Sequence, residues 1–301
     1  MPVPEALQAL TTIRDFVRWG GSEFNRHGLM FGHGFVDAID EARYLTLHAL
    51  SLPHDCPDTL LDAVLTPAER ESVFDCLHRR CRERMPAAYI TRESWFCGLR
   101  FYVDQRVLVP RSPLAELIMA GFEPWADPAG IRSVLEIGTG SGCIAIVCAL
   151  AFPDARVTAT DISPDALAVA TLNVARHGVG DRLELVETDL SEGLQGPFDV
   201  IITNPPYVPD SEQADLPAEY GHEPALGLYS GADGLDSARR ILQDAPALLA
   251  QDGILVLEVG AQWADLEAAF PGLPMTWLDF EHGGAGVAVF KAADLRQAFL
   301  V

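Results

Sequence analysis

Seven apolar segments of five or six residues follow one another between residues 133 and 291, and stretches long enough for helices separate most of them. Short apolar runs of this kind predict buried strands. Their alternation with helices predicts an α/β fold, in which helices cover both faces of a mostly parallel sheet. The expected strands are 133–137, 156–160, 183–187, 198–203, 254–259, 276–280 and 287–291, and the clearest helices are 144–151, 164–177 and 236–245.

The chain before this region has a helical pattern, over residues 4–86. Leu7, Leu10 and Val17 recur at helical spacing, and we expect Gly20-Gly21 to end that helix. Further on, Thr66-Pro67-Ala68-Glu69 has the form of a capping box with proline in the first turn. It predicts the start of another helix.

A change of pattern near residue 87 divides the chain. Residues 95–103 predict two short strands that turn at Gly98. We therefore expect a helical substrate-recognition domain over 1–86, a β-hairpin linker over 87–103 and a catalytic domain over 104–301. The helical part carries one cluster of charge, residues 79–84, with four arginines. This cluster is either a contact for RNA or an acidic partner, or a solvated helix face.

Most of the negative charge lies in the second part of the chain. Residues 1–100 hold 11 arginines and 14 acidic residues, whereas residues 101–301 hold 10 basic and 29 acidic residues, for a total of −22. A surface this acidic repels bare nucleic acid and attracts basic partners, although general solubility is the alternative explanation.

Neither the cysteines nor the histidines indicate a metal site. The six cysteines include no C-x-x-C pair, and the eight histidines show no metal-binding spacing. Residues 1–15 lack the basic and apolar regions of a leader, and no apolar run is long enough to span a bilayer. We therefore expect a cytoplasmic protein with reduced thiols.

The fourth expected strand ends in Asn204, Pro205, Pro206 and Tyr207. Proline has no N–H for the sheet, so the pair must stop the strand and stiffen the turn. The Asn204 side-chain oxygen and the Pro205 carbonyl can accept the two hydrogens of a planar NH2 group, while Tyr207 lies against its π system. These four residues are the candidate catalytic group. The alternative is a turn in which the prolines only end a strand.

A glycine-rich loop follows the first expected strand and precedes a helix. Glycine lets the backbone turn sharply and approach a ligand. The third glycine of a dinucleotide fingerprint would fall at Cys143, and no lysine follows for a P-loop. The candidate residues of this loop, with the acid before it, are Glu136, Gly138, Thr139, Gly140, Ser141 and Gly142.

Two carboxylates end the next two strands. Asp161 can accept hydrogen bonds from both hydroxyls of a ribose, and Asp189 can reach an adenine amino group. Each could instead be a helix cap or turn residue. Together with the glycine loop, they favour a nucleoside cofactor without a pyrophosphate.

These motifs resemble a known family. The loop, Asp161 and Asp189 are similar to the S-adenosylmethionine site of class I methyltransferases, and residues 204–207 resemble the signature of those that methylate planar NH2 groups. Residues 109–118 and 222–228 resemble the HemK-like protein-glutamine methyltransferases. The resemblance covers nearly the whole chain and implies a Rossmann-like, seven-stranded sheet. It also places Leu190 beside the adenine, where the release-factor enzymes have an aromatic residue.

Within this family, three motifs resemble the branch that acts on large-subunit ribosomal protein L-three. They are residues 110–113, Pro-Arg-Ser-Pro, residues 32–34, Gly-His-Gly, and residues 40–42, Asp-Glu-Ala. The resemblance implies methylation of a glutamine side-chain nitrogen in that basic protein. The alternatives are the release-factor branch, a DNA adenine methyltransferase, for which no basic groove is evident, and a non-catalytic ribosome-assembly binder.

Overall fold

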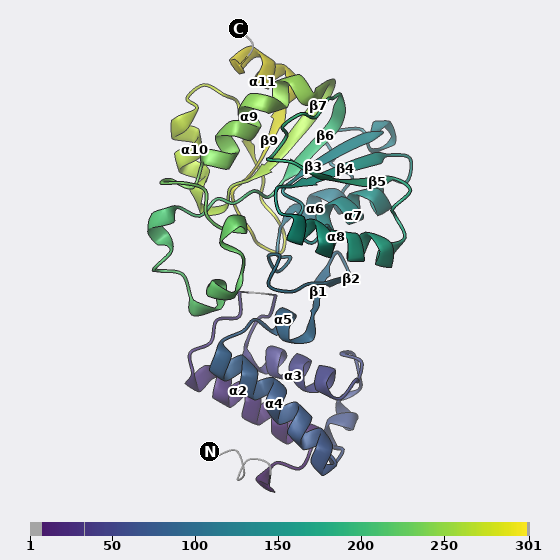
Figure 1. Cartoon of the computed structure of the whole chain (residues 1–301), viewed down its shortest axis with the longest axis vertical. Helices are drawn as coiled ribbons and strands as arrows, with labels where there is room; N and C mark the ends of the chain where they lie inside the picture. Colours follow the sequence, from purple (N-terminus) through teal and green to yellow (C-terminus); the bar gives the residue numbers. More distant parts are fainter. Residues whose placement is uncertain (1–7, 33, 300–301) are drawn as a thin grey trace. The chain divides into compact units, whose positions relative to one another are not determined.

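A computed structural model of the chain describes residues 8–32 and 34–299, so Leu7 and His33 lie outside the described residues. The chain forms two compact units (Figure 1). The first comprises Met1–Glu93 and Pro217–His222, and the second comprises Ser94–Leu216 and Glu223–Val301. The return of residues 217–222 to the first unit has no signal in the sequence.

The first unit is built of helices. They are α2 (Ile13–Arg26), α3 (Ala38–Ala49), α4 (Pro67–Glu83) and α5 (Ala87–Thr91), with the short helix η1 (Asp58–Asp62). The capping box at the start of α4 is confirmed: the Thr66 hydroxyl accepts from the Glu69 N–H, and the Glu69 carboxylate accepts from the Thr66 N–H at 2.7 Å. Two N–H groups at the start of the helix are thereby satisfied.

The expected end of the first helix at Gly20-Gly21 is wrong, because α2 continues through both glycines to Arg26. A Cβ on Gly20 would lie 3.1 Å from side-chain atoms of Ala42 and Leu77, and one on Gly21 would lie 2.4 Å from Ile39. The glycines therefore allow α3 and α4 to approach α2 closely. Packing against the neighbouring helices outweighs the cost of about 1 kcal/mol for each glycine in a helix.

The arginine cluster of α4 is not a uniformly solvated face. Arg79 and Arg82 are exposed, but Arg80 is only 1% exposed. The Arg80 guanidinium donates to Glu41 at 2.6 Å and forms an ion pair with Glu219 at 3.3 Å. Both carboxylates are buried. Arg80 thus binds residues 217–222 to α3 and α4 within the first unit.

The second unit contains a seven-stranded sheet in the order β5-β4-β3-β6-β7-β9-β8, as the sequence predicts for the fold class. Five neighbouring strands pair in parallel, and β9 runs antiparallel to both of its neighbours. The strands are β3 (Ser133–Ile137), β4 (Arg156–Asp161), β5 (Leu183–Glu187), β6 (Phe198–Thr203), β7 (Leu249–Glu258), β8 (Thr276–Trp277) and β9 (Val287–Lys291). A separate hairpin pairs β1 (Glu93–Phe96) with β2 (Leu99–Tyr102).

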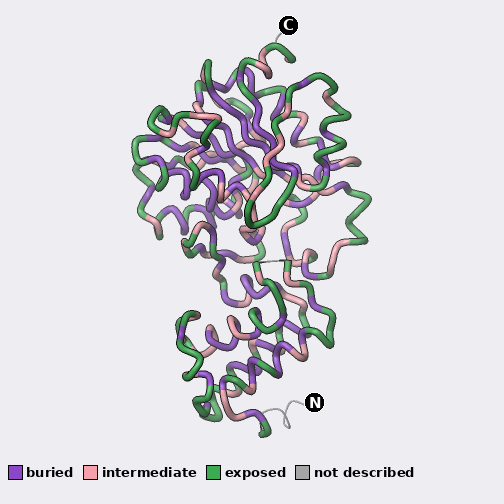
Figure 2. The backbone as a smooth tube through the Cα atoms, turned by 180° about the vertical axis from the view of Figure 1, so that it is seen from behind, coloured by how far each residue is buried: buried purple, intermediate pink, exposed green. Residues whose placement is uncertain are grey.

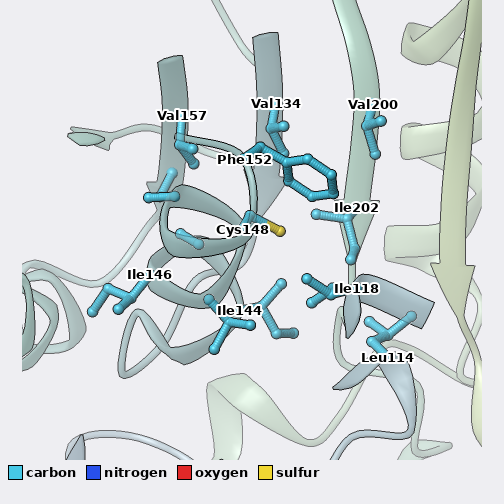
Figure 3. Close-up of a cluster of buried hydrophobic side chains, with 14 of the residues drawn as sticks. Leu114, Ile118, Val134, Ile144, Ile146, Cys148, Phe152, Val157, Val200 and Ile202 are labelled. Carbon is cyan, nitrogen blue, oxygen red and sulfur yellow. The ribbon is translucent and has the colours of Figure 1, made fainter. Parts of the chain in front are cut away.

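Two apolar clusters cover the two faces of this sheet. Alternate residues of the central strands contribute to opposite clusters, so that Val200 and Ile202 belong to one and Ile201 to the other. The first cluster receives α6 (Leu114–Met119), α7 (Cys143–Ala151) and α8 (Pro164–His177), as the close-up in Figure 3 shows for α6 and α7. The second receives α9 (Asp236–Leu248), α10 (Trp263–Ala269) and α11 (Ala292–Phe299).

The central strands are buried along their length (Figure 2). Polar groups near the carboxyl ends of these strands are therefore held by a rigid frame. Within the described part of the chain, no helix is both long and apolar enough to cross a membrane.

Candidate active site

The candidate groups gather at the carboxyl edge of the parallel strands. The glycine loop follows β3, Asp161 ends β4, Asp189 follows β5 and Asn204 follows β6. The strand β3 lies between β4 and β6, so the chain order reverses between β3 and β6. This is the switch point at which open α/β sheets bind their ligands. The Thr203 hydroxyl donates to the Ile137 carbonyl at 2.8 Å and joins the ends of the two strands.

Asn204 leaves the sheet directly after the buried end of β6. It is partly exposed, and no described residue forms a hydrogen bond with its side-chain amide. Four residues later the backbone is hydrogen-bonded again. The Val208 N–H donates to the Leu228 carbonyl at 2.8 Å, and the Val208 carbonyl accepts from the Ser230 N–H at 3.0 Å. The amide therefore stands on a short turn that is held at both ends.

Two glycines far along the sequence leave room for Tyr207. Gly260 has φ +51°, and a Cβ there would lie 2.7 Å from Cε2 of the Tyr207 ring. Gly234 has φ +77°, and its Cβ would lie 2.2 Å from the Tyr207 carbonyl oxygen. Any side chain at either position would displace the tyrosine. Neither glycine was expected at the site from the sequence, although Gly260 comes directly after an expected strand.

The glycine loop has a conformation that only glycine adopts without strain. Gly138, Gly140 and Gly142 have φ values of +75°, +55° and +81°. The N–H groups of Gly138 and Thr139 donate to the Thr160 carbonyl at 2.9 and 2.8 Å. A Cβ on Gly138 or Gly140 would meet no atom within 4 Å, so the space beside these residues is open. The loop can accept a ligand against its backbone.

Glu136 holds this loop in place through two hydrogen bonds. Its carboxyl is 1% exposed and accepts from the Thr139 hydroxyl at 2.5 Å and from the Ala145 N–H at 2.9 Å. Burial raises the pKa of Glu136 to about 8, although both hydrogen bonds lower it in part. The carboxyl thus joins the loop to the first turn of α7. The buried Ser141 is held in a similar way, since its carbonyl accepts from Asn173 at 2.9 Å.

The two aspartates differ in their surroundings. Asp161 accepts from the Gly140 N–H at 2.8 Å and from the Ser163 N–H at 2.9 Å, and burial raises its pKa. Asp189 is more exposed and forms an ion pair with Arg240 at 2.9 Å. Leu190 has φ +54°, and its carbonyl accepts from the Thr160 hydroxyl at 2.9 Å.

A set of polar residues near the end of β7 was not expected at the site from the sequence. Arg111 forms a two-pronged ion pair with Glu223, at 2.5 and 2.7 Å, and Glu223 also accepts from the Val109 N–H at 3.0 Å. Ser112 donates to Glu258 at 2.5 Å. Two sequence motifs far apart in the chain, 109–118 and 222–228, therefore meet in the structure.

Glu258 ends β7 and is 4% exposed. Burial raises the pKa of its carboxyl to about 7, while the hydrogen bond from Ser112 and the charge of Arg111 lower it in part. No group of His, Cys, Asp and Glu side chains among residues 8–32 and 34–299 could hold a metal ion.

Comparison with known proteins agrees with this arrangement. The family model "Methyltransferase small domain" matches residues 125–219. The ribosomal protein uL3 glutamine methyltransferase of Bordetella pertussis is 52% identical over 274 residues, which cover 90% of this chain and 92% of that protein. The proteins of the same name from Burkholderia pseudomallei and Neisseria gonorrhoeae are each 49% identical and cover at least 94% of both chains.

Among solved structures, the catalytic domain of hMettl16 in complex with a MAT2A hairpin is similar in fold. It has a TM-score of 0.51 and 17% sequence identity, and the match covers 76% of this chain and 83% of that one. The similarity supports the class I methyltransferase fold. The curated relatives indicate the family as well as the fold, because their sequence identity extends over both units. The chain belongs to the family of ribosomal protein uL3 glutamine methyltransferases.

Proposed function

We propose that the protein transfers the methyl group of S-adenosylmethionine to the side-chain nitrogen of a glutamine in ribosomal protein uL3. The single observation that carries this proposal is the Asn204 amide, which no described residue engages, beside the open glycine loop at the switch point. The relatives that match over both units are named for this reaction.

The residues at the switch point fit the cofactor. The open side of Gly138 and Gly140 leaves room for a ligand without a Cβ in the way. Asp161, already oriented by the Gly140 and Ser163 N–H groups, has the acceptor capacity for ribose hydroxyls. Asp189 and Leu190 follow β5, and we assign them to the adenine of the cofactor. When bound, S-adenosylmethionine supplies an electrophilic methyl carbon.

The turn after β6 would hold the acceptor. An amide nitrogen is a poor nucleophile because its lone pair is delocalised into the carbonyl. The Asn204 side-chain oxygen and the Pro205 carbonyl can accept its two hydrogens and so aim the lone pair, and such positioning is worth several kcal/mol. The same oxygens favour the positive charge that develops on the nitrogen. Tyr207, which lies against Gly234 and Gly260, would fix the plane of the amide and exclude water.

The partner is a basic protein, and the acidic residues 101–301 suit it. We assign partner selection to the helical part of the chain. In support, residues 217–222, which come between Tyr207 and Glu223 in the chain, belong to the first unit, where Arg80 and Arg84 bind Glu219. We place the protein in the cytoplasm, where ribosomal proteins are made.

The experiment is a methylation assay with labelled S-adenosylmethionine and three substrates: uL3, a peptide chain release factor and duplex DNA. We expect label in uL3, on a glutamine located by tandem mass spectrometry. Equal or greater label in the release factor would favour that branch of the family. Label in none of the three would favour a non-catalytic binder.

A further inference from the structure

The proposed reaction releases a proton from the target nitrogen, and the turn at Asn204 offers no base to receive it. A carboxyl does lie nearby. Glu258 is the last residue of β7, and β7 pairs in parallel with β6. The last pair of this register joins Thr203 to Leu257. Continued by one residue, the register sets Asn204 beside Glu258, at the spacing of about 4.8 Å between neighbouring strands.

Both residues also belong to the same face of the sheet. Val200 and Ile202 of β6 and Ile254 and Val256 of β7 all contribute to the cluster under α6 and α7. Side chains alternate between faces along a strand, so Asn204 and Glu258 continue this face at its carboxyl edge. A ligand that reaches Asn204 from this side therefore also meets Glu258.

The hydrogen bonds of Glu258 leave one oxygen available. Its Oε2 accepts from the Ser112 hydroxyl at 2.5 Å, which fixes the carboxyl. No described residue donates to Oε1, although the side chain is only 4% exposed. Oε1 is therefore an acceptor that a ligand beside Asn204 could use. A proton that the target nitrogen releases beside Asn204 after methyl transfer could pass to this oxygen.

We propose that Glu258 is a catalytic residue whose Oε1 accepts the proton released by the target glutamine nitrogen, an inference that rests on the proposed function. The nitrogen forms a bond to the methyl carbon as the carbon–sulfur bond breaks, and that electron pair stays on sulfur. The N–H proton then passes to Oε1, and the neutral methylamide leaves. Glu258 returns the proton to water before the next turnover.

The charges around Glu258 keep this carboxyl able to titrate near neutrality. Burial raises its pKa, and Arg111 from the 109–113 segment opposes that shift, although Arg111 is also paired with Glu223. Two charged groups on the adjoining elements, Glu116 of α6 and His282 of the loop before β9, bind each other at 3.1 Å. On β9 the paired residue is Val287, which does not titrate.

The experiment compares the pH dependence of kcat in the wild type and in Glu258→Gln, which keeps the shape and an acceptor for Ser112. In the wild type, kcat should rise about tenfold per pH unit below a midpoint near 7 and then level off. In Glu258→Gln this rise should vanish, with kcat lowered about 10²-fold and the affinity for S-adenosylmethionine within a few-fold. Glu116→Gln, a matched loss of one acid on α6, should keep the wild-type profile.

A second variant keeps the Glu258 carboxyl and therefore tests the inference even if Glu258→Gln does not fold. Ser112→Ala removes the hydrogen bond that lowers the pKa of Glu258, so the kinetic midpoint should move to higher pH, whereas Ser112→Thr should keep it. Unchanged profiles in both Glu258→Gln and Ser112→Ala would overturn the inference. If the wild type placed no methyl group on a uL3 glutamine, the proposed function itself would fail, which is a different result.

Discussion

Arg111 and Glu223 stand 112 positions apart in the chain and form a two-pronged ion pair within the second unit. The Glu223 side chain is fully buried, and that of Arg111 is 24% exposed. The pair brings the segment before α6 against the segment after residue 222. Ser112, the next residue, is thereby set against Glu258. One ion pair thus connects two distant sequence motifs with the end of β7.

Arg111→Gln should destabilise the second unit, because it leaves the Glu223 carboxylate buried without its cation. Breaking a buried pair in this way costs about 3 to 5 kcal/mol. Urea unfolding measures the loss. The matched control is Arg106→Gln, which breaks a more exposed pair with Asp104 and should cost at most about 1 kcal/mol. Similar losses of unfolding free energy in the two variants would mean that the Arg111–Glu223 pair stabilises the protein no more than the exposed pair does.

Asp161→Ala should weaken the binding of S-adenosylmethionine. The carboxylate has two acceptor oxygens for the ribose, and hydrogen bonds to a charged group are worth about 1.5 to 3 kcal/mol, or about ten- to a hundredfold in affinity. Isothermal titration calorimetry gives the value directly. Asp161→Asn retains one acceptor and should lose less. An affinity equal to that of the wild type would remove Asp161 from the cofactor site.

Gly260→Ala should lower turnover through Tyr207. The new Cβ would lie 2.7 Å from the tyrosine ring at a residue with φ +51°, so the ring must move. A displacement of about 1 Å near reacting groups can cost about 10²-fold in rate. Gly180→Ala, where the Cβ meets only an ordinary contact at 3.5 Å, serves as the control. The idea fails if steady-state assays find wild-type kcat for Gly260→Ala.

Glu136→Gln should change how stability depends on pH. The carboxyl has a pKa of about 8 when folded and 4.5 as its reference value, so the folded state binds more protons between these values. The free energy of unfolding contributed by Glu136 therefore falls as pH rises from about 5 to 8, by about 1.4 kcal/mol per pH unit. Glutamine does not titrate, so this part of the decline should disappear. Parallel curves for the two proteins would contradict the assignment.

Local signals in the sequence predicted most elements of the fold. The capping box at Thr66 and the apolar runs of β3 and β6 agree with the structure, because propensity, pattern and burial favour the same element there. The strand β8 is only two residues long, where five were expected. The expected break at Gly20-Gly21 is wrong, because helix packing outweighs the intrinsic preference of glycine.

Contacts between residues that lie far apart in the sequence had no such local signal. Arg80 lies in a run of arginines that looks solvated, and only the fold shows that Glu41 and Glu219 enclose it. Glu258 likewise looks like the polar end of a strand. Its hydrogen-bond partner Ser112 is 146 positions away, and the register of β6 and β7 brings Asn204, 54 positions away, to the same edge of the sheet.

The most direct test is mass spectrometry of uL3 from cells that lack this protein and carry either the wild-type chain or Asn204→Ala. The proposal predicts one methyl group on a uL3 glutamine with the wild type and none with the empty strain or with Asn204→Ala, which should still bind S-adenosylmethionine within a few-fold. A methylated glutamine in the empty strain, or undiminished methylation with Asn204→Ala, would contradict it.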